Sequence, residues 1–200
     1  MNPTVLWFRR DFRLQDHAAL TAAVARGGPI LALFICDEQV ENLGAAPKWR
    51  LGASVAVLQT ALVTKGNRLI LRRGCALPIL KALVAETGAK AVYWQRAYDP
   101  NSQSRDRAVK SALLDMDVEA QSFKGHLLFE PWTVQTKAGG FFKVYTPMWN
   151  SVRSRDVPAP LPEPAFIPAP MNFPKSENLA DWHLGHQMQR GLDIVAGYAR

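Results

Sequence analysis

The chain lacks the features that identify secreted, membrane-spanning or disulfide-stabilised proteins. Its 200 residues include only two cysteines, Cys36 and Cys75, in no CxxC pair. This scarcity argues against a disulfide scaffold or a structural zinc site and favours a reducing compartment. No apolar run approaches the roughly 18 residues that a membrane span needs, and no basic-then-apolar signal segment opens the chain. We therefore expect a cytoplasmic protein.

Standard catalytic motifs are missing as well. The turn after the first apolar segment has no G-x-G-x-x-G and no Walker lysine, which disfavours ordinary dinucleotide and P-loop chemistry. Neither H-E-x-x-H nor G-x-S-x-G occurs. His183 and His186 lie three residues apart without a third ligand, so no metal site is expected. The chain alone therefore predicts no catalytic site.

Positive charge is in moderate excess. Lysine and arginine number 24 against 17 acidic residues, for a net charge of +7. This balance favours polyanionic partners, although no single basic run dominates. Hydrophobic residues make up 48% of the chain, which is enough to build a buried core.

Apolar and helical patterns alternate along residues 4–123. Four apolar runs predict strands at residues 5–8, 29–36, 69–71 and 91–94, and residues 118–123 would form a fifth strand. Four intervening segments predict helices at residues 17–26, 48–64, 76–86 and 102–114. Asp16 precedes the first helix as its expected N-cap. The alternation predicts an α/β fold with a five-stranded parallel Rossmann-like sheet and helices on both faces.

The pattern changes beyond residue 123. Residues 126–132 and 141–145 flank Lys137-Ala-Gly-Gly140, which predicts a turn between two short extended pieces. A short helix is expected from residue 146 to about residue 155. These residues form an extension of the sheet domain.

A proline-rich segment follows the extension. Residues 157–174 hold seven of the fourteen prolines, which excludes a helix or an interior strand and favours a semi-rigid linker. Leu192, Val195, Ala196 and Ala199 would then form one side of a final helix. This tail either leads to a second domain or folds back on the first one.

A charged turn directly follows the first apolar strand. Val5-Leu-Trp-Phe8 runs into Arg9, Arg10, Asp11 and Arg13. Ligands of open α/β sheets bind beyond the carboxyl ends of the strands, so these side chains form a candidate polar platform. The alternative is a solvated loop with local ion pairs.

Four ordered stretches resemble the DNA photolyase/cryptochrome family. They are Leu6-Trp-Phe-Arg-Arg-Asp-Phe-Arg-Leu-Gln-Asp-His-Ala-Ala-Leu20, Ala46-Pro-Lys-Trp-Arg50, Ala91-Val-Tyr-Trp94 with Tyr98-Asp-Pro100, and Phe142-Lys-Val-Tyr-Thr-Pro-Met-Trp149. Phe12 and His17 stand where the family more usually has leucine and asparagine. The resemblance covers about residues 4–155, and the later tail is similar to the family's interdomain connector.

The resemblance implies the antenna half of a photolyase. In this family the N-terminal α/β domain holds a light-harvesting chromophore, which is a reduced folate, a deazaflavin, a flavin or a lumazine. A C-terminal helical domain binds FAD and damaged DNA, and its excited reduced flavin reverses pyrimidine dimers (deoxyribodipyrimidine photo-lyase). The chain alone would be inactive and monomeric, with the FAD domain, and damaged DNA through that domain, as its partners. The alternative within the family is a cryptochrome-type photoreceptor half.

The resemblance also implies a division of the chain. We expect an antenna domain at residues 1–130, an extension packing on it at 131–156, a proline-rich linker at 157–174, and a helical connector at 175–200. The FAD-binding domain would follow this connector.

A flat chromophore needs apolar walls and a few orienting hydrogen bonds. The strand ends offer Phe8, Phe34, Cys36 and Trp94 as walls, with Arg9, Arg10, Asp37 and Arg96 as polar partners. The resemblance adds Arg50 and the loop of Tyr98, Asp99 and Asn101. The predicted antenna site is therefore Arg10, Phe34, Cys36, Asp37, Arg50, Tyr98, Asp99 and Asn101, without a metal.

Arg50 is the favoured cation for a folate or deazaflavin tail, and its alternative is a surface helix arginine. Asn101 matches folate-type antennas, but Ser102 follows where these carry glutamate. Ala97 stands where deazaflavin-type relatives tend to be acidic. The chromophore type therefore stays open.

Two other function classes fit the residues. One is a small nucleotide-binding α/β protein without a Walker loop, whose basic first turn would hold phosphate. The other is a non-catalytic nucleic-acid-binding module, which rests on the net charge of +7.

Overall fold

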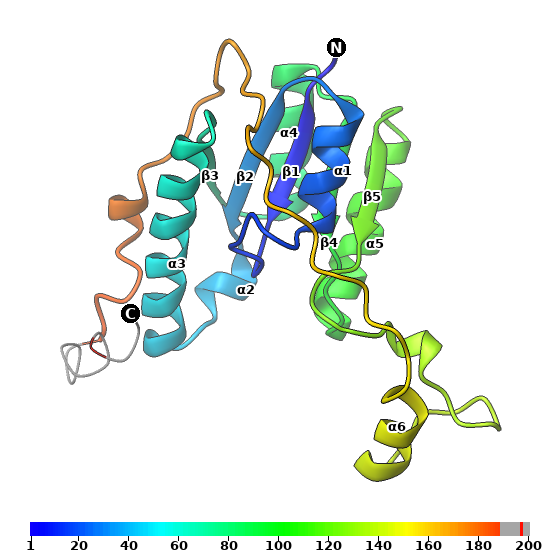
Figure 1. Cartoon of the computed structure of the whole chain (residues 1–200). Coiled ribbons are helices and arrows are strands. Elements are labelled where there is room, and N and C mark those ends of the chain that lie inside the picture. The colour runs from blue at the N-terminus through cyan, green and yellow to red at the C-terminus, as the bar shows by residue number, and fades with distance from the viewer. Residues whose placement is uncertain (189–196, 198–200) are drawn as a thin grey trace.

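Five buried segments pair into one parallel sheet in the computed structural model of the chain, which describes residues 1–188 and residue 197 (Figure 1). The strands are β1 (Thr4–Phe8), β2 (Ile30–Cys36), β3 (Leu69–Arg73), β4 (Ala91–Gln95) and β5 (Glu119–Phe123). They lie in the order β3-β2-β1-β4-β5, and every neighbouring pair is parallel. The α/β fold class predicted from the alternating pattern is confirmed.

Strand β1 is the centre of the sheet. Val5 pairs with Leu31 of β2 on one side and with Val92 of β4 on the other. The chain adds β2 and β3 on one side of β1 and then returns to add β4 and β5 on the opposite side. The strand order therefore reverses between β1 and β4. In an open α/β sheet, the carboxyl ends of two such strands flank the place where ligands bind.

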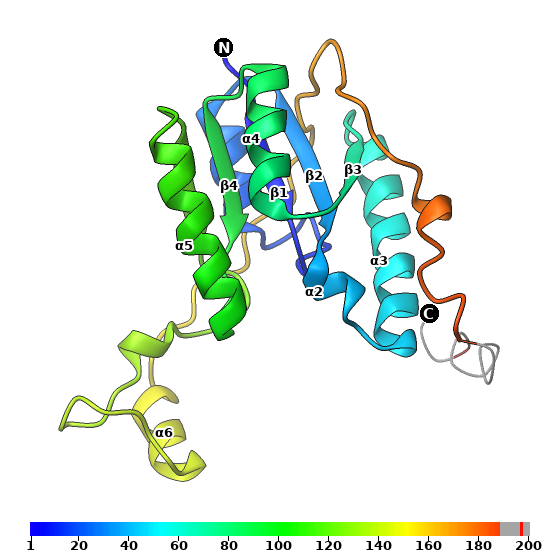
Figure 2. The same cartoon turned by 180° about the vertical axis from the view of Figure 1, so that it is seen from behind.

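Helices cover both faces of the sheet (Figures 1 and 2). Leu6 and Phe8 pack in one apolar cluster with α1 (Ala18–Arg26) and α3 (Ala45–Thr64). Val5 and Trp7 pack in a second cluster with α4 (Ala76–Thr87) and α5 (Pro100–Leu114). This division follows from the alternation of side chains along a strand.

The helix boundaries lie within three residues of the predicted ones, but one short helix is additional. Helix α2 (Glu38–Glu41) follows β2, and the Asp37 carboxylate accepts a hydrogen bond from the Val40 amide at its start. Helix α5 begins at Pro100 because the Asp99 carboxylate caps the Ser102 amide. Gly88 ends α4 in the left-handed conformation, as predicted.

The N-cap of α1 is His17, and the prediction of Asp16 is wrong. His17 Nδ1 accepts a hydrogen bond from the Leu20 amide at 3.0 Å. Its Nε2 lies 2.8 Å from Asp11 Oδ2, and both side chains are buried. Asp16 has a φ of 50° and points to the chain segment around Leu161, whose amide donates to the Asp16 carboxylate at 3.3 Å. The buried Asp11 thus draws His17 into the capping position.

The extension contains a turn but no strand within the described residues. Thr136 and Gly139 make the turn hydrogen bonds around residues 136–140. The flanking segments form the short 3-10 helix η1 (Pro131–Thr133) and helix α6 (Tyr145–Val152). This extension projects away from the carboxyl edge of the sheet (Figure 1).

The proline-rich segment carries no helix or strand and is held against the α1/α3 face. The Asp16 amide donates to the Leu161 carbonyl at 2.9 Å, and the Ile30 amide donates to the Pro168 carbonyl at 2.8 Å. Ile167 donates its amide to the Lys65 carbonyl and is fully buried in the cluster of that face. The segment is therefore part of the folded body.

The beginning of the tail also packs on the domain. The 3-10 helix η2 (Leu179–Trp182) places Trp182 against Phe34, with ring centroids 5.9 Å apart. Gly185 has a φ of 91°, and a side chain there would lie 2.6 Å from Trp49 Cβ, so α3 and the tail touch closely. The expected final helix around Leu192 lies outside the described residues.

Replacing His17 by alanine should lower the free energy of unfolding by about 3 kcal/mol. The substitution removes the cap of α1, which contributes about 1 kcal/mol, and leaves a buried Asp11 oxygen unpaired, which costs about 2 kcal/mol. Urea unfolding followed by circular dichroism measures the change. The control Asp16→Gly tolerates the positive φ, removes only a half-exposed carboxylate, and should cost less than about 1 kcal/mol. Equal losses for the two variants would contradict the assignment of the cap.

Candidate functional site

A pocket opens at the carboxyl edge of the sheet, beside the ends of β1 and β2. Its apolar wall consists of Trp7, Phe34, Ile35, Val40, Leu43 and Leu51. Its polar rim includes Arg9, Arg10, Asp37, Ser102, Arg105 and His126. The cavity volume is about 50 Å³. The pocket thus lies at the reversal of strand order.

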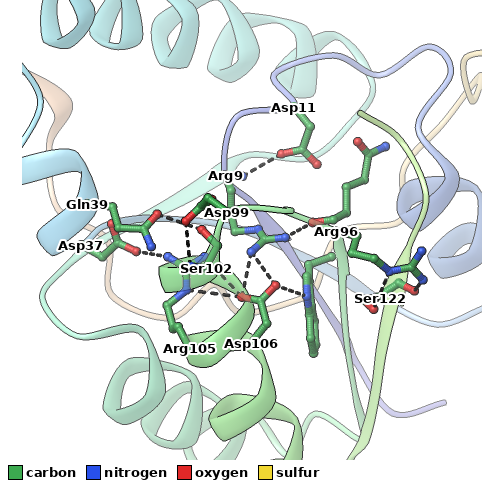
Figure 3. A network of polar contacts seen from close by, with 12 residues as sticks. Arg9, Asp11, Asp37, Gln39, Arg96, Asp99, Ser102, Arg105, Asp106 and Ser122 are labelled. Carbon is green, nitrogen blue, oxygen red and sulfur yellow. Dashed lines mark hydrogen bonds and ion pairs between the residues drawn. The ribbon is translucent and has the colours of Figure 1, made fainter. Parts of the chain in front are cut away.

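Arg9, one of the rim residues, forms a nearly buried ion pair with Asp106 (Figure 3). Arg9 donates from Nη1 to both carboxylate oxygens of Asp106, at 2.9 and 2.8 Å. The Arg9 Nη2 group donates to the Gln95 carbonyl at the end of β4. Asp106 also accepts a hydrogen bond of 3.1 Å from Trp94 Nε1. The pair therefore joins the ends of β1 and β4 to helix α5.

Two further contacts cross from α5 to the turn after β2 (Figure 3). Arg105 Nη1 lies 2.5 Å from Asp37 Oδ2, and Ser102 Oγ donates to Gln39 Oε1 at 3.1 Å. The Arg105 guanidinium also lies over the Trp7 ring, 4.9 Å from its centroid. The residues that make these contacts all belong to the pocket lining: Trp7, Asp37, Gln39, Ser102 and Arg105. The contacts therefore connect α5 with the segment after β2 at the pocket.

Asp11 shapes the turn that carries the rim arginines. Its Oδ1 accepts the Arg9 backbone amide at 2.8 Å, and its Oδ2 faces the His17 ring. Burial alone would raise the pKa of Asp11. The hydrogen bonds from His17 and Arg9 outweigh burial and hold this pKa below its usual value. The carboxylate is thus an ionised structural group, and it lies outside the pocket lining.

Three of the predicted antenna residues line the pocket: Arg10, Phe34 and Asp37. Cys36 does not, because it is buried in the cluster below and its thiol donates to Glu41 at 3.5 Å. Burial, with the nearby Glu41 carboxylate, raises the pKa of Cys36 to about 12, so the thiol stays protonated.

Arg50 and the loop after β4 also lie outside the lining. Arg50 is exposed on α3, while its neighbour Leu51 lines the pocket. The Tyr98 hydroxyl donates to Glu130 in the extension at 2.9 Å, and Asp99 caps α5. Asn101 is exposed.

Sequence reasoning missed several lining residues, including Gln39, Leu43, Leu51, Arg105 and His126. Helical periodicity places Ser102 and Arg105 on one side of α5, three residues apart, and this was the available signal. Gln39 and Leu51 lie on helices α2 and α3, and Leu43 and His126 lie in loops. The sequence pattern does not show which side of these helices and loops faces the pocket.

No group of three or more metal-ligating side chains occurs among residues 1–188. Over that same stretch, no helix is both long enough and apolar enough to cross a membrane.

Sequence comparisons place the chain among known proteins. The family model described as DNA photolyase matches residues 4–165. The deoxyribodipyrimidine photo-lyase of Agrobacterium fabrum is 44% identical over 183 residues, which cover 91% of this chain and 38% of that protein. Cryptochrome-1 of Arabidopsis thaliana is 35% identical over 170 residues, which cover 82% and 25%. The chain spans less than half the length of these curated relatives.

Solved structures agree with this placement. A bacterial class III photolyase from Agrobacterium tumefaciens has a TM-score of 0.88 and 43% identity, over 92% of this chain and 38% of its own. An archaeal photolyase from Sulfolobus tokodaii, solved with two FAD molecules, has a TM-score of 0.72 at 22% identity, over 90% and 40%. This second likeness concerns the fold alone.

Replacing Asp106 by alanine should lower the free energy of unfolding by about 3 kcal/mol, because the Arg9 charge would lose its partner in a nearly buried site. The two side chains are only 9% and 13% exposed. Urea unfolding gives the measurement. Glu86→Ala is the matched control, since it removes the exposed Arg72–Glu86 pair and should cost less than about 1 kcal/mol. A loss for Asp106→Ala no larger than that of the control would show that the pair does not stabilise the site.

Proposed function

Because the chain belongs to the DNA photolyase family, we propose that it is the antenna part of a light-driven DNA repair photolyase and binds a light-harvesting chromophore. The observation that carries the proposal is the pocket at the reversal of strand order, which has an apolar wall and an arginine-rich rim. A reduced folate, a deazaflavin, a flavin or a lumazine would occupy it.

The pocket residues suit an antenna. A flat conjugated ring needs apolar surfaces and a few polar contacts that fix its orientation. Trp7 and Phe34 supply such surfaces, and the rim supplies guanidinium and carboxylate groups. The cavity of about 50 Å³ is smaller than the roughly 300–1,000 Å³ of typical ligand sites. The chromophore ring would therefore also occupy the solvent-open space in front of the cavity.

The catalytic chemistry of the proposed photolyase lies outside this chain. In that proposal, FAD in a C-terminal helical domain receives the excitation energy and reverses pyrimidine dimers in damaged DNA. The antenna needs geometry and no acid–base group, in keeping with the stable ion pairs and protonated thiol around the pocket.

The extension is the proposed contact surface for that FAD-carrying part. Large apolar side chains are exposed along and beside it: Leu127, Leu128, Trp132, Phe141, Val144, Tyr145, Trp149 and Val157. Exposed apolar patches of this kind mark interaction sites. In this proposal residues 175–200 are the connector to the FAD domain, and the whole protein is a cytoplasmic monomer.

A cryptochrome-type photoreceptor is the second candidate, favoured by the 35% identity to Cryptochrome-1 of Arabidopsis thaliana. The photolyase proposal is preferred because the identity to the bacterial photo-lyase is higher, at 44%. Family membership leaves a free-standing nucleotide binder or a nucleic-acid-binding module without support.

Filling the pocket should abolish chromophore binding. Ala97 lies in the lining, so Ala97→Trp would place an indole ring where the ligand must lie. Titration of the protein with the four chromophore classes, followed by visible absorption, should give a shifted band for the unsubstituted chain and none for Ala97→Trp. Ala159→Trp makes the same exchange in a different hollow and should leave the band intact. If neither the unsubstituted chain nor the control shifts the band of any chromophore, the antenna proposal fails.

The chain alone should not repair DNA. In the proposed division of labour the FAD-binding part lies outside these 200 residues, so supplied FAD, a reductant and blue light should leave a thymine dimer in an oligonucleotide intact. The photo-lyase of Agrobacterium fabrum is a suitable positive control for the assay. Light-dependent reversal by this chain would disprove the division of labour proposed above.

A further inference from the structure

We propose that the ligand of this pocket carries an anionic group, a phosphate or a carboxylate, and that Arg10 is the residue that binds it. The inference rests on the proposed function of the pocket and adds the charge of its ligand. It makes Arg10, and not Arg50, the residue that discriminates charged from neutral chromophores.

Two of the three arginines in the rim are neutralised within the protein. Arg9 Nη1 donates to both carboxylate oxygens of Asp106, at 2.9 and 2.8 Å. Arg105 lies 2.5 Å from Asp37 and 3.3 Å from Asp106. The positive charge of each of these guanidinium groups is balanced by a carboxylate of the protein, so their attraction for an anionic ligand is weakened.

Arg10 differs from both. It lines the pocket and is exposed, and its guanidinium makes no hydrogen bond or ion pair with any residue that the structure describes. The charge of Arg10 acts on the Asp99 carboxylate, whose pKa it helps to lower together with the hydrogen bonds from Ser102. The Asp99 carboxylate is already used, since it accepts the Ser102 amide at 2.9 Å to cap α5.

The remaining titratable group of the rim does not change this balance. His126 has a lowered pKa because burial disfavours its charged form; Asp11 opposes this effect, and the charges of Arg9, Arg13 and Arg10 add to it. The ring is therefore mainly neutral at pH 7. Among the described residues that line the pocket, Arg10 thus supplies the one positive charge without a carboxylate partner.

The turn after β1 explains why adjacent arginines differ. Asp11 accepts the Arg9 amide and fixes this turn, while the Arg9 side chain reaches across to α5 and β4. Arg10 is then left at the rim, next to the apolar wall that includes Trp7 and Phe34. A ligand with a flat ring and an anionic tail would satisfy both parts, because guanidinium binds phosphate and carboxylate with two parallel hydrogen bonds.

Matched ligand pairs test the inference. FMN and riboflavin share one ring and differ in a phosphate, as do 5-deaza-FMN and 5-deazariboflavin. Tetrahydrofolate and 6-methyltetrahydropterin differ in the glutamate-bearing tail, and 6,7-dimethyl-8-ribityllumazine is a further probe without an anionic tail. Absorption titrations at low salt should show the anionic member of the binding pair held about tenfold more tightly, as expected for one charge-assisted contact. Added salt should reduce this preference.

Variants assign the preference to a residue. Arg10→Gln should lower the affinity for the anionic member about tenfold and leave that for the neutral member unchanged, while Arg10→Lys should keep part of the preference. Arg50→Gln tests the rival residue and should have little effect. Arg107→Gln, an exposed arginine of α5 outside the pocket lining, is the control.

The outcomes separate the inference from the proposed function. Four results would overturn the inference and leave the antenna function standing. Two concern the ligands: equal binding of both members of a pair, or preferred binding of the lumazine. Two concern the variants: an unchanged preference in Arg10→Gln, or loss of the preference in Arg50→Gln. Failure of every probe to bind would overturn both.

Discussion

The Arg9–Asp106 ion pair is the interaction on which the carboxyl edge of the sheet depends. It joins β1, β4 and α5 at the point where the strand order reverses. The backbone ladder between β1 and β4 ends at Trp7 and Trp94, and beyond it the chain continues from β1 toward α1 and from β4 toward α5, on opposite faces of the sheet. Arg9 supplies attraction and orientation there, because its Nη1 donates to both Asp106 oxygens and its Nη2 donates to the Gln95 carbonyl. The pocket beside it therefore has one rigid flank, which an antenna needs because energy transfer depends on the orientation of its chromophore.

The charged turn after β1 serves two purposes that the sequence does not separate. Arg9 and Asp11 are structural, since one anchors α5 and the other is buried against His17. Arg10, between them, is exposed at the pocket rim. The turn is therefore not a solvated loop with only local ion pairs, because Arg9 pairs with Asp106 of α5 and Asp11 is buried against His17. A ligand-binding role for the exposed Arg10 stays a prediction.

The sheet was predictable because each of its first four strands is buried on both faces or nearly so, and such strands read as unbroken apolar runs. The predicted site residues that line the pocket are those for which residue type and a place at a strand end coincided: Arg10, Phe34 and Asp37. Cys36 lies on the same side of β2 as Phe34, but it is buried in the α1/α3 cluster and its thiol donates to Glu41. Arg50 is exposed on α3 outside the lining, because tertiary packing sets which side of α3 faces the pocket, and Leu51 lies there. His17 caps α1 through its Nδ1 while its Nε2 contacts the buried Asp11, and ordinary N-cap preferences do not predict this arrangement.

The proline-rich segment bears on how an antenna could be held at a fixed distance from a flavin in a longer protein. A free tether would let the two chromophores reorient, and transfer would lose its geometric control. Here Ile167 is buried and three backbone hydrogen bonds fasten residues 161–168 to the body. Farther along, Trp182 packs on Phe34, which also lines the pocket. The pocket wall and the start of the proposed connector thus share one apolar cluster, so a shift of either would disturb the packing of the other.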